Sequence, residues 1–216
     1  AFVGLCEGHN LLAPALFKDL APDSMLWVRT PAVVCQLLCG VLVGVNVYRL
    51  GRKHLVAALF ASGLFFLNSA LYNWTGFGRV DFMALLFNLL GLTLLASGEK
   101  RLDALAWSGL CFALALFAKQ SQIMAPVAAC LFLLWRAPKR GVAFALALGA
   151  AVAAVALALH AATGGQYLRH TVLYNANVFY WDQLWVWIRH SLRFEGLAWL
   201  ALAVAGARHL ALVLYL

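Results

Sequence analysis

Charged residues are scarce in this chain. Only 11% of its 216 residues are Asp, Glu, Lys or Arg, whereas 65% are hydrophobic. A soluble domain has about a quarter charged residues and about half apolar residues. The scarcity of charge therefore argues against an ordinary water-soluble domain and predicts an integral membrane protein.

Metal-ligand patterns and a nucleic-acid-binding face are also missing. Cys35 and Cys39 lie four residues apart, but no His or second Cys pair follows at metal-ligand spacing, so we interpret the cysteines as packing residues. No cofactor is assigned with certainty, and a divalent metal stays open. The net charge is +8, yet the basic residues form short clusters between apolar runs. That distribution is typical of membrane topology and argues against nucleic acid as a partner.

Long apolar runs dominate what is present. Runs of about 17–25 apolar residues predict membrane-spanning helices. The candidate spans are residues 31–48, 55–72, 82–97, 104–118, 123–135, 142–162 and 197–216, of which the fourth and fifth are short. We expect an all-α bundle of about seven spans that forms one transmembrane domain over residues 1–216. Residues 1–30 and 163–196 are predicted to be outer loops, and membrane lipids are expected contacts.

Lysine and arginine alternate between the two sides of these spans. Three tight connections hold eight of the sixteen basic residues, namely Arg49, Arg52, Lys53, Lys100, Arg101, Arg136, Lys139 and Arg140. The turns between them hold one each, Arg79 and Lys119. This is the positive-inside pattern, and it predicts that the three basic connections are cytoplasmic. The remaining polar residues then face the outer side.

Asp81 stands directly before the third span on this outer side. One interpretation is a helix N-cap that meets the positive end of the helix dipole. The other is a polar site, because Arg79 precedes it by two residues and Asn88 follows seven residues later on the same helical face. Both interpretations are open from the sequence.

The stretch "KQSQ" at residues 119–122 interrupts two apolar runs. Lys119 could snorkel to the membrane interface. Gln120, Ser121 and Gln122 favour a site instead, because they add hydrogen-bonding groups beside a charge that suits a phosphate.

The outer loop at residues 163–196 has two parts. Its second part repeats Trp181, Trp185, Ile188 and Leu192 at helical spacing, which predicts a helix lying in the interface or an aromatic belt. Its first part is rich in groups that bind polar ligands, and the candidates there are Arg169, His170, Tyr174, Asn175 and Asn177.

The order of these pieces resembles the GT-C glycosyltransferases that use polyprenyl-phosphate sugars. The similar stretches are "GHNLLAPALFKDLAPDSMLWVRTPAVV", "GRVDFMALLFNLLGL", "FALALFAKQSQIMAP" and "GGQYLRHTVLYNAN". They look closest to bacterial relatives of protein O-mannosyltransferases and lipid A aminoarabinose transferase. The resemblance implies a GT-C-like membrane fold in a bacterial inner (plasma) membrane, with the site facing the periplasm.

The resemblance also implies a reaction. A sugar would pass from a polyprenyl-phosphate donor to a hydroxyl of a lipid, glycan or protein acceptor, and basic groups would offset the growing charge on the phosphate. Asp81 is then a candidate catalytic residue. Arg79, Lys119, Gln120, Arg169, His170, Tyr174 and Asn175 are candidate substrate-binding residues.

The family's leading acid lies in the first outer loop, and this chain starts partway through that loop. We therefore expect the chain to be a fragment whose main catalytic acid lies upstream of Ala1. Two alternatives to a glycosyltransferase remain open. A multi-pass transporter would need polar groups at mid-span and internal repeats. A non-catalytic membrane scaffold would need none of the outer polar groups.

Overall fold

The computed structural model describes residues 26–50, 53–67, 80–98, 100–173, 180–186, 188–190, 192–193 and 196. Among the described residues up to position 173, it has six longer helices. These are α3 (Leu26–Leu50), α4 (Leu55–Leu67), α6 (Asp81–Gly98), α7 (Leu102–Ala118), α8 (Met124–Arg136) and α9 (Pro138–Ala162). Three short helical segments complete the list, η1 (Gln120–Ile123), α10 (Gln166–Leu168) and η2 (Arg169–Leu173). All elements of the described chain are helical, which confirms the all-α class.

The helices begin and end close to the predicted spans. Three of them, residues 29–49 of α3 together with α6 and α9, are long and apolar enough to cross a membrane. Helices α4, α7 and α8 are shorter than the roughly 20 residues that a bilayer core of about 30 Å requires. The length and the apolar composition of α3, α6 and α9 indicate an integral membrane protein. The predicted span at residues 197–216 lies outside the described residues.

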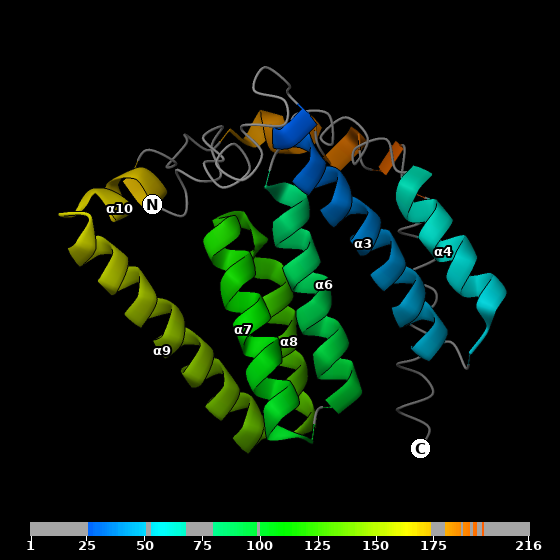
Figure 1. Cartoon of the computed structure of the whole chain (residues 1–216), viewed down its shortest axis with the longest axis horizontal. Coiled ribbons are helices and arrows are strands. Elements are labelled where there is room, and N and C mark those ends of the chain that lie inside the picture. The colour runs from blue at the N-terminus through cyan, green and yellow to red at the C-terminus, as the bar shows by residue number, and fades with distance from the viewer. Residues whose placement is uncertain are drawn as a thin grey trace. The chain divides into compact units, whose positions relative to one another are not determined.

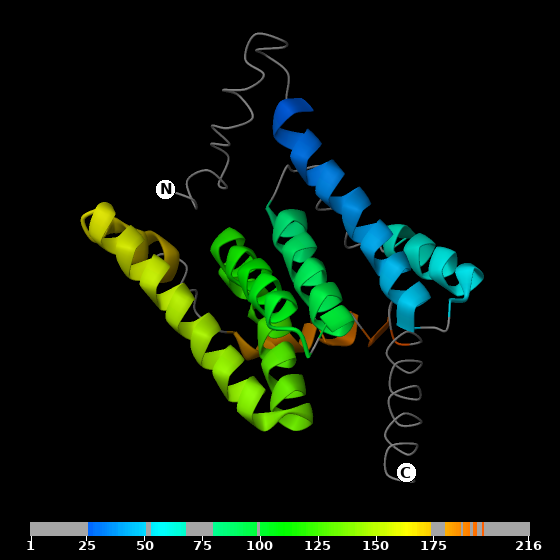
Figure 2. The same cartoon turned by 60° about the horizontal axis from the view of Figure 1, so that its bottom comes forward.

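The chain divides into two compact units, residues 1–173 and residues 174–216. In the first unit, α6 packs between α3 and α7, and α4 packs on α3 (Figure 1). Helix α8 returns beside α7 and α9 follows it, so the chain runs up and down through the bundle. Figure 2 shows the same order of helices from a second direction. This arrangement places the connections after α3, α6 and α8 at one end of the bundle.

The core of the first unit lies among α6, α7, α8 and α9. Phe112 and Leu133 are fully buried there, and the ring of Phe112 meets that of Phe144 edge to face at 6.4 Å. The close approach of α6 and α7 requires a glycine, because a Cβ on Gly91 would lie 2.7 Å from Cε1 of Phe112. The Ser108 hydroxyl donates to the Gly91 carbonyl across the same contact at 2.8 Å.

Basic residues collect at one end of the bundle, which we call the basic end. It comprises Arg49, Lys53, Lys100, Arg101, Arg136, Lys139 and Arg140. Nη1 of Arg49 donates to the Ser97 hydroxyl at 2.9 Å, and Arg101 pairs with Asp103 at 2.6 Å. The first contact joins the ends of α3 and α6, and the second lies at the start of α7. The opposite end, which holds Asp81 and the segment 119–122, we call the polar end.

The second unit contains helical backbone at residues 181–186 and 188–190. Trp181 and Trp185 are exposed on it. The exposed rings suit the predicted interfacial helix, whose position in a membrane stays a prediction.

Candidate functional site at the polar end

The polar end is built where α7 stops and α8 starts. Lys119 leaves the helix in an extended conformation with φ −153° and ψ 111°, and its N–H still donates to the Ala115 carbonyl. The next four residues form η1, which is kinked at Gln122 with ψ 28°. Helix α8 then begins and buries Pro126 in its first turn, where proline is tolerated. The polar residues 119–122 therefore occupy a tight turn at a helix end.

The central contact of this end is an ion pair between Lys119 and Asp81. Nζ of Lys119 lies against Oδ1 of Asp81, which is the first residue of α6. The two side chains are 28% and 25% exposed, so the pair is partly buried yet reachable from outside the helices. Asp81 also sits in the first turn of α6, where the helix dipole favours a negative charge. The ion pair and the position in the first turn are compatible with both interpretations of Asp81, a helix cap and a polar site, and its role stays a prediction.

A buried amide lies two turns below the ion pair on the same face of α6. Asn88 is 3% exposed, and its Nδ2 donates to the main-chain oxygen of Gln122 at 3.2 Å and to Oε1 of Gln122 at 3.3 Å. The seven-residue spacing from Asp81 was the signal in the sequence. The hydrogen bonds between Asn88 and Gln122 fix the turn to α6. Lys119 lies nearer the end of the bundle, where it pairs with Asp81.

Gln120 connects this turn to the segment after α9. Its Nε2 donates to the main-chain oxygen of Thr171, in η2, at 2.6 Å. Ser121 is exposed and has no contact of this kind among the hydrogen bonds of the described residues. The turn therefore contacts α6 on one side and the chain beyond α9 on the other.

Arg169 lines a second feature of the polar end, a cavity of about 350 Å³. His160, Gln166 and the glycines 164 and 165 form the rest of its polar wall. Both glycines have positive φ, 57° and 88°, so the chain reverses there and brings His160 back beside Arg169. His160 is not among the candidate residues that the sequence suggested. The pair of glycines after it was the available signal.

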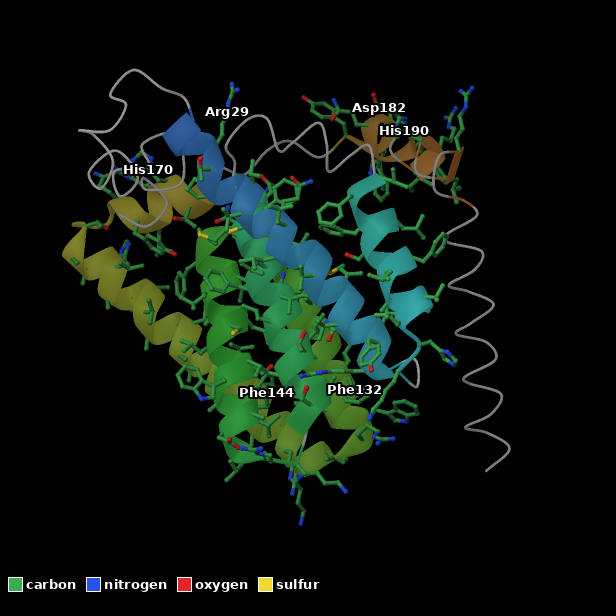
Figure 3. The ribbon with its side chains drawn as sticks, turned by 45° about the vertical axis from the view of Figure 1, so that its right-hand side comes forward. Arg29, Phe132, Phe144, His170, Asp182 and His190 are labelled. Carbon is green, nitrogen blue, oxygen red and sulfur yellow. The ribbon has the colours of Figure 1, made fainter. Side chains whose placement is uncertain are left out.

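The first turn after these glycines is anchored by Thr163 and Tyr167. The Thr163 hydroxyl accepts from the Tyr167 N–H at 2.9 Å and donates to the Leu159 carbonyl at 2.7 Å. Burial raises the pKa of the Tyr167 hydroxyl. His170 follows Arg169 and is exposed, and Figure 3 shows it at the same end of the bundle as Arg29.

The structure thus brings together Asp81, Lys119 and Gln120, with Arg169 in the segment that Gln120 contacts. The predicted residues Arg79, Tyr174 and Asn175 lie outside the described residues. In the part of the chain that is described, no three His, Cys, Asp or Glu side chains gather in a way that could hold a metal ion.

The sequence of the chain matches the model of a known protein family. The family model for dolichyl-phosphate-mannose-protein mannosyltransferases matches residues 15–163, more than half of the chain. The chain belongs to this family. The comparisons with curated proteins and with solved structures gave no match.

Membership of the mannosyltransferase family assigns a general activity and leaves details open. The protein is a membrane glycosyltransferase of the mannosyltransferase type, for which the family implies a lipid-linked sugar donor and an acceptor. The matched segment includes the whole of α6, α7 and α8 and therefore both partners of the Lys119–Asp81 pair. The segment with Arg169 and His170 lies beyond the match.

Proposed function

We propose that the full-length protein moves a sugar from a polyprenyl-phosphate donor to an acceptor hydroxyl on the outer face of a bacterial plasma membrane. The family supports transfer from a lipid-linked sugar. The separation of a basic end from a polar end supports the outer location, because basic connections stay on the cytoplasmic side. The acceptor is a lipid, glycan or protein on the periplasmic side.

The observation that carries this proposal is the ion pair of Lys119 and Asp81. A lysine near the end of a membrane helix needs no partner, because its long side chain can reach the interface. Here the ammonium group is instead held by a carboxylate at a partly open position. The ion pair holds the ammonium group of Lys119 at a position where a phosphate can replace the carboxylate of Asp81 as the partner of this ammonium group. A phosphate group offers more charge and more acceptor oxygens than the carboxylate does.

The proposed reaction follows from this exchange. Lys119 moves from Asp81 to the donor phosphate, and a carboxylate of the polar end takes the proton from the acceptor hydroxyl. The acceptor oxygen bonds to the anomeric carbon of the sugar while the bond from that carbon to the phosphate oxygen breaks. Polyprenyl phosphate leaves with the electron pair, and the ammonium group of Lys119 offsets the charge that develops on it.

Asp81 is the candidate for the carboxylate among the described residues of the first unit. The other carboxylate described there, Asp103, lies at the basic end and pairs with Arg101. Arg79, Gln120, Arg169, His170, Tyr174 and Asn175 complete the proposal as substrate-binding residues. Of these, Arg169 lines an open cavity of about 350 Å³ and suits an anionic or sugar group.

Transfer from a radiolabelled polyprenyl-phosphate sugar tests the proposal. Full-length protein in membranes is compared with its Lys119→Gln and Arg101→Gln variants at matched expression. Both substitutions remove one cation from an ion pair, but only Lys119 lies at the polar end. We expect Lys119→Gln to lose about 100-fold in transfer rate, as when one charge-stabilising group is removed from an active site. Arg101→Gln should keep wild-type activity, and equal rates for all three proteins would contradict the proposal.

A further inference from the structure

A long groove runs between α7 and α9, away from the polar end. Its volume is about 520 Å³. Its lining comes from one face of each helix and is apolar except for Arg140. The proposed glycosyl transfer does not use this groove.

Small residues make the groove hollow. Helix α7 contributes Ala106, Gly109 and Ala113 at intervals of three and four residues, and α9 contributes Ala143, Ala147 and Ala151 at intervals of four. Residues at these intervals share one face of a helix. Phe144 also lines the groove, and its ring lies close to Gly109 of α7. Because the alanine and glycine residues are small, a groove stays open between the two helices. Larger side chains at the same positions would fill it.

Arg140 lies at one end of the groove, and from there the groove extends along α9 away from the basic end. This arginine lies in the first turn of α9, at the basic end of the bundle. Val155 lines the groove fifteen residues further along the helix, which corresponds to about 22 Å at 1.5 Å per residue. One leaflet of a bilayer core is about 15 Å thick, half of the whole. The groove is therefore long enough for a lipid chain that starts at the basic surface.

The size of the groove also limits its occupant. A helix is about 10–12 Å across with its side chains, so it would rest on the rim of a groove between two helices that already touch through Phe112 and Phe144. A single hydrocarbon chain is much thinner. Arg140 at the end of the groove favours an occupant whose hydrocarbon chain carries a negatively charged group at the membrane surface.

We propose that this groove binds one acyl chain of an anionic phospholipid, with the lipid phosphate at Arg140. Basic pockets between membrane helices at the cytoplasmic surface are suited to anionic headgroups. The lipid fills the groove between α7 and α9 and adds to the contact that Phe112 and Phe144 make between the two helices. This role is independent of the glycosyltransferase reaction at the polar end.

The test counts bound lipids on the full chain by native mass spectrometry after release from nanodiscs. The nanodiscs contain equal amounts of phosphatidylglycerol and phosphatidylcholine with identical acyl chains. We expect the wild-type protein to retain one phosphatidylglycerol in preference to phosphatidylcholine. Arg140→Gln should weaken this preference about fivefold, the factor that one basic residue contributes near a membrane surface.

Two matched controls separate the groove from general effects. Lys53→Gln removes a charge from the same end but outside the groove lining and should leave the preference unchanged. Ala147→Leu fills the groove and should abolish the retained lipid, whereas Ala150→Leu places the same side chain on an exposed face of α9 and should not. Ala151→Leu repeats the filling one turn further along if Ala147→Leu does not fold.

Several outcomes would overturn the proposal. An equal loss of the phosphatidylglycerol preference in Lys53→Gln and Arg140→Gln would show that the preference comes from the general surface charge and not from the groove. Retained lipid in a folded groove-filling variant would place the lipid elsewhere. A change in oligomeric mass with Ala147→Leu would assign the groove to a second copy of the chain, and complete displacement by added polyprenyl phosphate would assign it to the donor lipid.

Discussion

Lys119, which follows the last residue of α7, forms an ion pair with Asp81, the first residue of α6. The two residues are 38 positions apart in the chain, yet they meet because α6 and α7 pack antiparallel over their lengths. The contact joins the start of one membrane helix to the end of the next. It leaves both side chains about a quarter exposed. A pair with this burial can hold the fold together, or bind a substrate, or do both.

Exchanging the two charges separates these roles. In the variant Asp81→Lys with Lys119→Asp, an ion pair can form in the reverse direction. We expect thermal stability in detergent to recover relative to either single variant, because opposite charges again face each other. Transfer activity should stay absent, because a carboxylate at position 119 repels the donor phosphate. Full activity in the exchanged variant would show that the pair only supports the fold.

Asp81→Asn tests the carboxylate by itself. Asparagine and aspartate are about equally good N-cap residues, so α6 should still form. We expect transfer activity to fall at least about 100-fold, the scale that general acid–base groups contribute. Asp103→Asn removes the acid of the ion pair with Arg101, at the basic end, and serves as the control. The variants are compared in the transfer assay at equal protein level, and normal activity of Asp81→Asn would rule out a catalytic role.

Lys119→Arg complements the glutamine variant used to test the proposed function. Arginine keeps the positive charge but replaces a compact ammonium group by a planar one. We expect intermediate transfer activity, with the defect seen as weaker use of the lipid-linked donor. A snorkelling lysine would tolerate arginine completely. The measurement is the apparent KM for the donor in wild type and in both variants.

Gly91→Ala should destabilise the bundle. The added Cβ would lie 2.7 Å from Cε1 of Phe112, a side chain that is fully buried and has no room to move away. Overpacking of this kind costs about 1–3 kcal/mol. Gly149→Ala is the control, because a Cβ there meets nothing within 4 Å, and it should be neutral or slightly stabilising. Thermal unfolding in detergent measures both variants, and Phe112→Leu should partly rescue Gly91→Ala.

The sides of the membrane are tested by labelling single cysteines. In a background without the five native cysteines, we expect a cysteine at position 121 to react with an impermeant reagent from outside. A cysteine at position 139 should react only after the membrane is opened. Ser121 and Lys139 are both exposed at opposite ends of the bundle, which makes them a matched pair. Labelling of position 121 only from the cytoplasmic side would contradict the proposed outer site.

Several features of the protein follow from the sequence by itself. The scarcity of charged residues indicated that the chain lies in a membrane. The apolar runs located α3, α6, α7, α8 and α9 to within a few residues. These features depend on local properties, since hydrocarbon length and backbone hydrogen bonding force apolar segments into helices. The clusters of arginine and lysine likewise identified the basic end. The stretch at residues 119–122 was recognised as a polar turn because it breaks an apolar pattern.

Only the tertiary structure decided which groups meet. Spacing placed Asp81 and Asn88 on one face of α6, but the rotation and depth of α7 and α8 determine that Lys119 reaches the first and Gln122 the second. The reversal at the two glycines brings Arg169 to the cavity that His160 also lines. The groove beside Arg140 exists because two faces of small residues lie opposite each other. Such contacts depend on how whole helices pack, and that packing sums many weak contacts far apart in the chain.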